Sequence, residues 1–245
     1  MCGILSSVFV CKMMKNLTKP KGLKPPFSWE QRHILIQDRV WFAPDCLTSS
    51  EFQFPGWSHP DIFGNDLPVK IEYCSGNGEW ITKKAFDDPH SNWVAIEKRF
   101  DRTRLIWSKI KKMKLNNLFV ICGEGHCVTS RYFFDRSINE VFINFPDPWP
   151  KRRHAKHRIL KNPFIEQLLR ILRSEGTLTV VTDDVDYSES LNNLMKGHTA
   201  FLPAYSSPYY RNQIEGYGSS FFDQLWREKG REIRYHLYHK RRGVA

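Results

Sequence analysis

Residues 69–78 read VKIEYCSGNG, a β-rich run that passes directly into a turn with two glycines. The run predicts a strand, and Gly76 and Gly78 allow the backbone to turn sharply and to approach a ligand. Four further β-rich runs follow along the chain: NWVAIE at 92–97, LFVIC at 118–122, VFINF at 141–145 and TLTVVT at 177–182. The stretches between them are long enough for crossover helices. Strands that alternate with helices predict an α/β fold with a mostly parallel, doubly wound sheet covered on both faces.

The segment between the last two of these runs has a helical pattern. Its apolar residues recur at the spacing i, i+3, i+4 and i+7, namely Ile165, Leu168, Leu169 and Leu172. Pro163 suits the first helical turn, and Gly176 is expected to close the helix as a C-terminal cap. Near the C-terminus, polar and apolar residues alternate over 232–237, which predicts a final strand that runs antiparallel in the sheet.

Size and charge limit the class of protein. With 245 residues, of which 41% are hydrophobic, the chain is long enough to bury one substantial core. The formal net charge is +11, from 37 Lys and Arg against 26 Asp and Glu. Such a surface attracts a polyanion, either nucleic acid or an acidic membrane, and the charge alone does not decide between them.

The N-terminal part differs in composition from the rest. Residues 12–30 carry five lysines and three prolines, so we expect residues 1–45 to form a basic arm and residues 46–245 the folded domain. The apolar run at 3–11 is too short to span a bilayer and makes a poor signal peptide, and Met13 and Met14 are alternative start sites. The six cysteines form no C-x-x-C pair, which favours free thiols in a reducing cytoplasm.

Acidic residues stand at or just beyond the carboxyl end of each predicted strand. They are Glu72, Glu97, Glu124, Asp147 and Asp183. In an open α/β sheet, ligands bind outside the carboxyl ends of the strands. A single acid there would be an ordinary solvated side chain, but five in succession predict an acidic crevice inside an otherwise basic protein.

The acid before the glycine turn limits the ligand. Glu72 would repel a phosphate but attract a cationic or hydroxyl-rich ligand, and the dinucleotide spacing G-x-G-x-x-G is absent. This favours a positively charged nucleoside such as S-adenosylmethionine over NAD. Glu97 stands where a carboxylate can accept hydrogen bonds from both ribose hydroxyls, and Glu124 could bind the adenine amino group. Each of these two acids could instead be an ordinary helix N-terminal residue.

Residues 144–158 read NFPDPWPKRRHAKHR and divide into two halves. In the first half, flanking prolines restrict the backbone around Asp147, and Trp149 offers a broad face for packing or stacking. The second half carries basic side chains that could hold phosphates: Lys151, Arg152, Arg153, His154, Lys156, His157 and Arg158. A rigid buried turn followed by a solvated basic face is the alternative interpretation.

This loop resembles the signature F-P-D-P-W-x-K-x-R-H-x-K-R-R of the bacterial tRNA (guanine-N7)-methyltransferases of the TrmB type, and the resemblance extends from about Lys70 to the C-terminus. It implies a Rossmann-like, class I S-adenosylmethionine-dependent methyltransferase fold, tRNA as the partner and a variable-loop guanine as the acceptor. By resemblance, the cofactor pocket contains Glu72, Gly76, Gly78, Glu97, Glu124 and Asp147, and Asp147 is the expected catalytic residue. The residues expected to bind the tRNA substrate are Lys151, Arg153, His154, Lys156, Asp183, Ser220 and Asp223.

The implied reaction needs positioning more than proton transfer. Guanine N7 has an in-plane lone pair and no proton at neutral pH, so alignment with the methyl donor could supply about 7–11 kcal/mol of barrier reduction. The acceptor becomes cationic, so Asp147 could stabilise the transferred charge or bind the guanine N–H edge. We expect no metal.

Three departures from the family pattern bear on activity. Cys74 replaces the first glycine of the family's turn, and His157 replaces the penultimate arginine of the signature loop. Ser220 and Asp223 each substitute a close relative in a motif that is similar to the family's T-x-[FY]-E. Two alternatives therefore stay open: a methyltransferase that acts on an exocyclic amine of nucleic acid, and a catalytically impaired RNA-binding module. In each case we expect a cytoplasmic monomer or homodimer without membrane contact or an obligatory protein partner.

Overall fold

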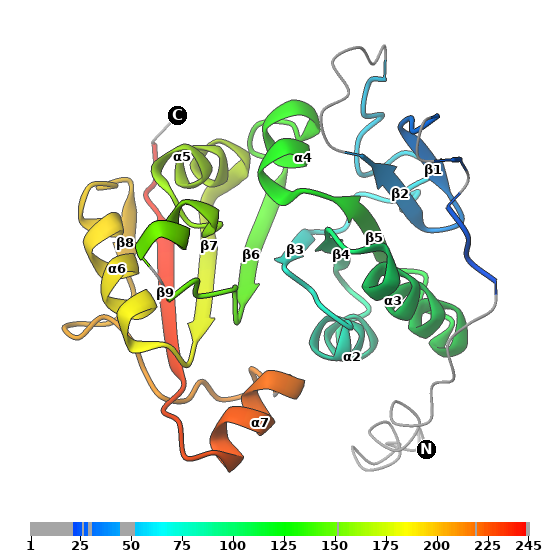
Figure 1. The fold of residues 1–245 in the computed structure, drawn as a ribbon. Coiled ribbons are helices and arrows are strands. Elements are labelled where there is room, and N and C mark those ends of the chain that lie inside the picture. The colour runs from blue at the N-terminus through cyan, green and yellow to red at the C-terminus, as the bar shows by residue number, and fades with distance from the viewer. Residues whose placement is uncertain are drawn as a thin grey trace, which may run out of the picture.

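The computed structural model describes residues 22–25, 27–28, 31–44, 52–150, 152–218 and 220–243. The strands in these residues are β1 (Leu35–Gln37), β2 (Val40–Ala43), β3 (Val69–Tyr73), β4 (Asn92–Glu97), β5 (Leu118–Gly123), β6 (Ile138–Asn144), β7 (Leu172–Thr182), β8 (Phe201–Pro203) and β9 (Arg234–Lys240). They form one sheet in the order β1-β2-β5-β4-β3-β6-β7-β9-β8 (Figure 1). The five predicted β-rich runs correspond to β3, β4, β5, β6 and β7.

The central part of the sheet is parallel. β2, β5, β4, β3, β6 and β7 pair in parallel, whereas β1, β8 and β9 pair antiparallel with their neighbours. β9 lies along β7, with Leu178 opposite Tyr238 and Val180 opposite His236. The predicted α/β fold, mostly parallel with a C-terminal antiparallel strand, is confirmed.

Helices cover both faces of the sheet (Figure 1). They are α2 (Glu79–Asp87), α3 (Phe100–Met113), α4 (Gly125–Tyr132), α5 (Asn162–Ile171), α6 (Val185–Lys196) and α7 (Phe221–Glu228), with a 3₁₀ helix η1 (Arg152–His157). Trp80 of α2 and Ile106 of α3 belong to the core on one face, whereas Ile165 of α5 and Leu191 of α6 belong to the core on the other. This is the doubly wound arrangement, which places the loops after the parallel strands at one edge.

The end of α5 was predicted wrongly. Pro163 lies in its first turn as expected, but the helix ends at Ile171, and Leu172 is already the first residue of β7. Gly176 lies inside β7, near the place where the pairing with β6 shifts register. A Cβ on Gly176 would lie 2.9 Å from the carbonyl oxygen of Arg173, so the glycine permits a close backbone approach. Leu172 is fully buried at the start of the strand, so it is apolar like the buried residues of α5. Its spacing from them therefore fitted a helix and hid the boundary between α5 and β7.

The predicted basic arm contains part of the sheet. Residues 35–43 form β1 and β2, in which Val40, Trp41 and Phe42 are buried, and β2 pairs with β5. The boundary predicted at residue 45 is therefore wrong for this segment, because the neighbouring lysines and prolines obscured a four-residue strand. Residues 1–21, with the apolar run and the alternative start sites, lie outside the described residues. Where the chain is described, no helix combines the length and apolar composition needed to cross a membrane.

Candidate functional site

The structure brings the five predicted acids to one edge of the sheet. Glu72 is the penultimate residue of β3, Glu97 is the last residue of β4, and Glu124 follows β5. Asp147 and Asp183 follow β6 and β7. Because these five strands are parallel neighbours, their carboxyl ends meet, and the arrowheads of β6 and β7 in Figure 1 point to this edge.

Glu72 is buried near the centre of the edge, with 2% of its surface exposed. Its Oε1 accepts a hydrogen bond from Asn144 Nδ2 at 2.7 Å, and Asn144 Oδ1 accepts one from Tyr217 Oη at 2.6 Å. The other oxygen, Oε2, is buried and has no hydrogen-bond partner in the described part of the chain. Burial raises the pKa of Glu72 to about 8, although the hydrogen bond from Asn144 opposes the shift. At a pKa of about 8 this carboxyl group is mostly protonated at neutral pH, and its Oε2 stays without a partner among the described residues.

The turn after β3 needs glycine for two reasons. Gly76 and Gly78 have left-handed backbone angles, with φ of 55° and 77°. A Cβ on Gly78 would also lie 2.7 Å from Ile106 Cγ1, which leaves no room for a side chain. Cys74, which replaces a glycine of the family's turn, has a φ of 59°. The backbone therefore keeps a glycine-like conformation at this position. A non-glycine residue in this region costs about 1–2 kcal/mol.

Glu97 and Glu124 already make hydrogen bonds within the protein. Glu97 Oε2 accepts from the Gly76 N–H at 2.9 Å and Oε1 from the Arg99 N–H at 2.8 Å, so this side chain fixes the glycine turn. Burial raises the pKa of Glu97, against these hydrogen bonds. Glu124 caps α4 by accepting from two N–H groups of its first turn. The helix-terminus interpretation therefore holds for Glu124, and any ligand of either acid would have to share or displace these bonds.

The loop after β6 presents Asp147 to solvent. Asp147 is exposed and has no hydrogen-bond or ion-pair partner among the described residues, so the loop is not a buried turn around it. Phe145 and Trp149 on either side have φ of 48° and 45°, a strained conformation that costs about 1–2 kcal/mol each. The Trp149 ring centroid lies 5.1 Å from that of His157 and 5.9 Å from that of His154. The loop therefore packs against the basic run while the carboxylate of Asp147 stays unpaired.

The basic run lies on the surface beside Asp147. Arg153, Lys156 and His157 are exposed on η1, and His154 is half-buried. Lys151 lies outside the described residues. The structure thus leaves three cationic or titratable side chains accessible next to the acidic edge.

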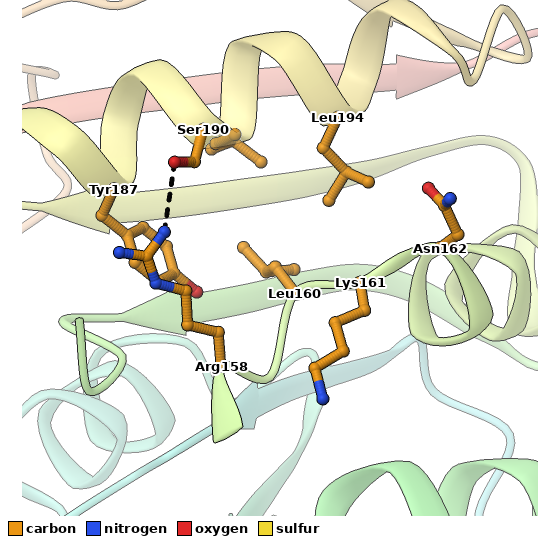
Figure 2. Close-up of a pocket in the computed structure, with 8 residues that line it drawn as sticks. Arg158, Leu160, Lys161, Asn162, Tyr187, Ser190 and Leu194 are labelled. Atoms are coloured by element: carbon orange, nitrogen blue, oxygen red, sulfur yellow. Dashed lines mark hydrogen bonds between the residues drawn. The ribbon is translucent and has the colours of Figure 1, made fainter. Parts of the chain in front are cut away.

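Arg158 differs from the rest of the run because its guanidinium is used within the protein. Nε donates to the Pro148 carbonyl oxygen at 2.7 Å, and Nη1 donates to Ser190 Oγ of α6 at 3.1 Å. Figure 2 shows the guanidinium over the Tyr187 ring, 5.2 Å from its centroid. Arg158, Tyr187 and Ser190 line a cavity of about 310 Å³ between α6 and the start of α5, whose other lining residues are Leu160, Lys161, Asn162, Leu191 and Leu194. Arg158 therefore anchors the Asp147 loop to α6.

The predicted substrate residues near the C-terminus are also paired. Asp183 forms an ion pair with Arg231. Ser220 caps α7 by accepting from the Asp223 N–H at 3.1 Å. The buried Asp223 carboxylate accepts a hydrogen bond from the Tyr235 hydroxyl of β9. Ser220 thus caps the start of α7, and Asp223 fixes the helix to β9.

The sequence did not predict two residues that lie next to Glu72 in the structure. Asn144 is a polar residue at the end of an apolar strand, and that position was its only signal. Tyr217 lies in an irregular segment that carries no pattern, and its carbonyl oxygen accepts a hydrogen bond from Trp80 Nε1 at 2.9 Å. Together they connect the C-terminal part of the chain to Glu72.

Comparison with known proteins decides the family. Residues 66–235 match the family model Methyltransf_4, described as "Putative methyltransferase". Over 227 residues, the chain is 40% identical to a protein of Chlamydia caviae named tRNA (guanine-N(7)-)-methyltransferase, a match that covers 92% of this chain and 100% of that protein. A protein of the same name from Chlamydia trachomatis is 41% identical over 227 residues, with the same two coverages. The chain belongs to the tRNA (guanine-N7)-methyltransferase family.

This member of the tRNA (guanine-N7)-methyltransferase family shares its fold with solved structures of low sequence identity. The protein PH0851 is similar with a TM-score of 0.53 and 12% identity, over 71% of this chain and 43% of that chain. At this identity the likeness concerns the fold alone. The resemblance found in the sequence is confirmed at the level of family.

Proposed function

We propose that this protein transfers a methyl group from S-adenosylmethionine to N7 of a guanine in tRNA, with the variable-loop guanine as the expected acceptor. The observation that carries the proposal is the unpaired Asp147 on an edge of carboxylates, directly beside an exposed basic run. An acidic edge suits a cationic nucleoside, and a basic surface suits a polyanion. The names of the Chlamydia relatives support the same reaction.

The residues at the edge fit the donor. When bound, S-adenosylmethionine supplies a methyl group on a positively charged sulfonium. Glu72 offers a buried oxygen without a partner, and Gly76 and Gly78 offer backbone that a ligand can approach closely. We assign Glu97 and Glu124 to the same pocket, on the condition that each releases or shares an N–H bond when the nucleoside binds.

The chain's part in the transfer is alignment and charge stabilisation. Guanine N7 needs no general base and no metal, because its lone pair is available at neutral pH. Holding the base in line with the donor supplies about 7–11 kcal/mol by positioning. The exposed Asp147 carboxylate stabilises the positive charge that reaches the base, or accepts a hydrogen bond from its N–H edge.

The tRNA is held by a separate set of residues. We assign phosphate contacts to Lys151, Arg153, His154 and Lys156, of which Arg153 and Lys156 are exposed. We also assign Asp183, Ser220 and Asp223 to the substrate, on the condition that Asp183 leaves Arg231 and Asp223 releases or shares its bond with Tyr235.

The proposal is tested by incubating the protein with unmodified tRNA transcript and methyl-labelled S-adenosylmethionine, followed by digestion and mapping of the label. The expected product is N7-methylguanine at one position of the variable loop, with Asp147→Ala as the inactive control. Label on an exocyclic nitrogen would refute N7 and support the exocyclic-amine enzyme. Binding of tRNA without binding of S-adenosylmethionine would support the RNA-binding module.

A further inference from the structure

Helix α7 leaves part of its apolar side exposed. Its apolar residues follow the spacing i, i+1, i+4 and i+5, which places them on one side of the helix: Phe221, Phe222, Leu225 and Trp226. A surface helix normally turns such a side to the core. In α7 the only buried residue is Asp223, which accepts hydrogen bonds from Arg227 and Tyr235. Trp226 at the end of the apolar side packs partly against the core, whereas Phe221 and Phe222 at its start stay exposed.

These phenylalanines continue to the loop that carries Asp147. Phe221 and Phe222 are 54% and 37% exposed, and their ring centroids lie 5.4 Å apart in a T-shaped arrangement. The Phe222 ring lies 6.2 Å from that of Phe145, two residues before Asp147. We call Phe145, Phe221 and Phe222 the aromatic surface. Figure 1 shows α7 beyond the carboxyl ends of β6 and β7, on the side of the proposed site.

We propose that the aromatic surface stacks against a base that is unstacked from the tRNA at the target loop. This inference rests on the proposed function and adds to it the group that receives the base. Proteins read single-stranded RNA by stacking splayed bases on aromatic side chains, while cations hold the phosphates on either side. Both parts of that combination are present here: Arg153 and Lys156 are exposed in the basic run that follows the Asp147 loop, and Lys229 is exposed directly after α7.

The charge of the surroundings favours RNA over an apolar protein partner. A protein surface that covered the two phenylalanines would also have to match the exposed Lys229 and a chain with a net charge of +11, whereas each unstacked base brings phosphates with it. Phe221 is the residue to vary, because Phe222 also contacts Phe145 in the loop of Asp147.

The test compares Phe221→Ala, Phe221→Leu and Phe221→Tyr with the matched control Phe134→Ala. Phe134 is 52% exposed but precedes β6, at the opposite edge of the sheet. Loss of one stacked base should lower kcat/KM for tRNA by roughly 5-fold to 150-fold in Phe221→Ala and Phe221→Leu. Phe221→Tyr and Phe134→Ala should remain near the wild-type value, and the Kd for S-adenosylmethionine should be the same in all of them.

A second readout does not depend on methyl transfer. A tRNA transcript with 2-aminopurine at the target guanine or immediately beside it should lose fluorescence on binding the wild-type protein, and lose less with Phe221→Ala. Unchanged kcat/KM and quenching in Phe221→Ala, or full activity in Phe221→Leu, would overturn the stacking. A homodimer that Phe221→Ala abolishes in sedimentation would assign the surface to a second copy and would also overturn it. A wild-type protein that makes no N7-methylguanine would refute the proposed function, while the quenching would still decide on the aromatic surface.

Discussion

Replacement of Glu72 by glutamine should make the protein more stable at alkaline pH. In the folded state Glu72 is buried with a pKa of about 8, whereas in the unfolded chain it titrates near its ordinary value of 4.5. Between these two values the folded state binds one proton more than the unfolded state. The free energy of unfolding therefore falls as pH rises through this window and levels off above pH 8.

The size of the effect follows from the two pKa values. Each unit of pH within the window costs about 1.4 kcal/mol, so the wild-type protein should lose about 4 kcal/mol from this group between pH 5 and pH 8. Glutamine has the shape of the protonated carboxyl group and can still accept the hydrogen bond from Asn144, but it does not ionise. Glu72→Gln should therefore match the wild type near pH 5 and exceed it progressively up to pH 8.

Urea unfolding at pH 5, 6, 7 and 8 measures this difference, because the other titrating groups are common to both proteins. Glu228→Gln, at an exposed position of α7, is the matched control and should follow the wild type at each pH. A constant difference between Glu72→Gln and wild type across the range would show that Glu72 is ionised in the folded protein at pH 5, and would refute the reasoning.

Three further outcomes are expected. Asp147→Ala should abolish methyl transfer with tRNA binding intact, whereas Arg153→Ala should weaken tRNA binding and reduce its salt slope by about one; equal loss of binding in both would contradict this division. Arg158→Lys should lower kcat roughly 10-fold or more without changing the salt slope, because lysine cannot make both hydrogen bonds that anchor the loop; a reduced slope would identify a phosphate contact instead. Gly78→Ala should lower the free energy of unfolding by about 2–4 kcal/mol in urea titrations, and Gly76→Ala by only about 1, because only the former meets a neighbour at 2.7 Å; equal losses would show that the contact is relieved by movement of α3.

The sequence predicted the parts of the fold that local patterns determine. The five long β-rich runs became β3 to β7, and the acids after them meet at one edge because parallel strands share that edge. The short strands β1, β2 and β8 were missed, since three or four residues carry too little pattern. The hydrogen bonds from Tyr217 to Asn144 to Glu72 were also missed, because they join segments that only the tertiary structure brings together. The same reason explains why the hydrogen bond from Tyr235 to Asp223, which fixes α7, was missed.

The structure also changes how an acidic edge can coexist with an anionic substrate. Five carboxylates at one edge would repel tRNA phosphates if all were charged and free, since screening at physiological salt acts only beyond about 8 Å. Glu72 is mostly neutral at pH 7, Glu97 and Glu124 accept backbone N–H bonds, and Asp183 is paired with Arg231. Of these five, Asp147 alone presents a carboxylate without a partner among the described residues, at the point where the proposed reaction produces positive charge on the base. The edge therefore presents far less negative charge to RNA than its composition suggests, and keeps its one free carboxylate beside the basic run that holds the phosphates.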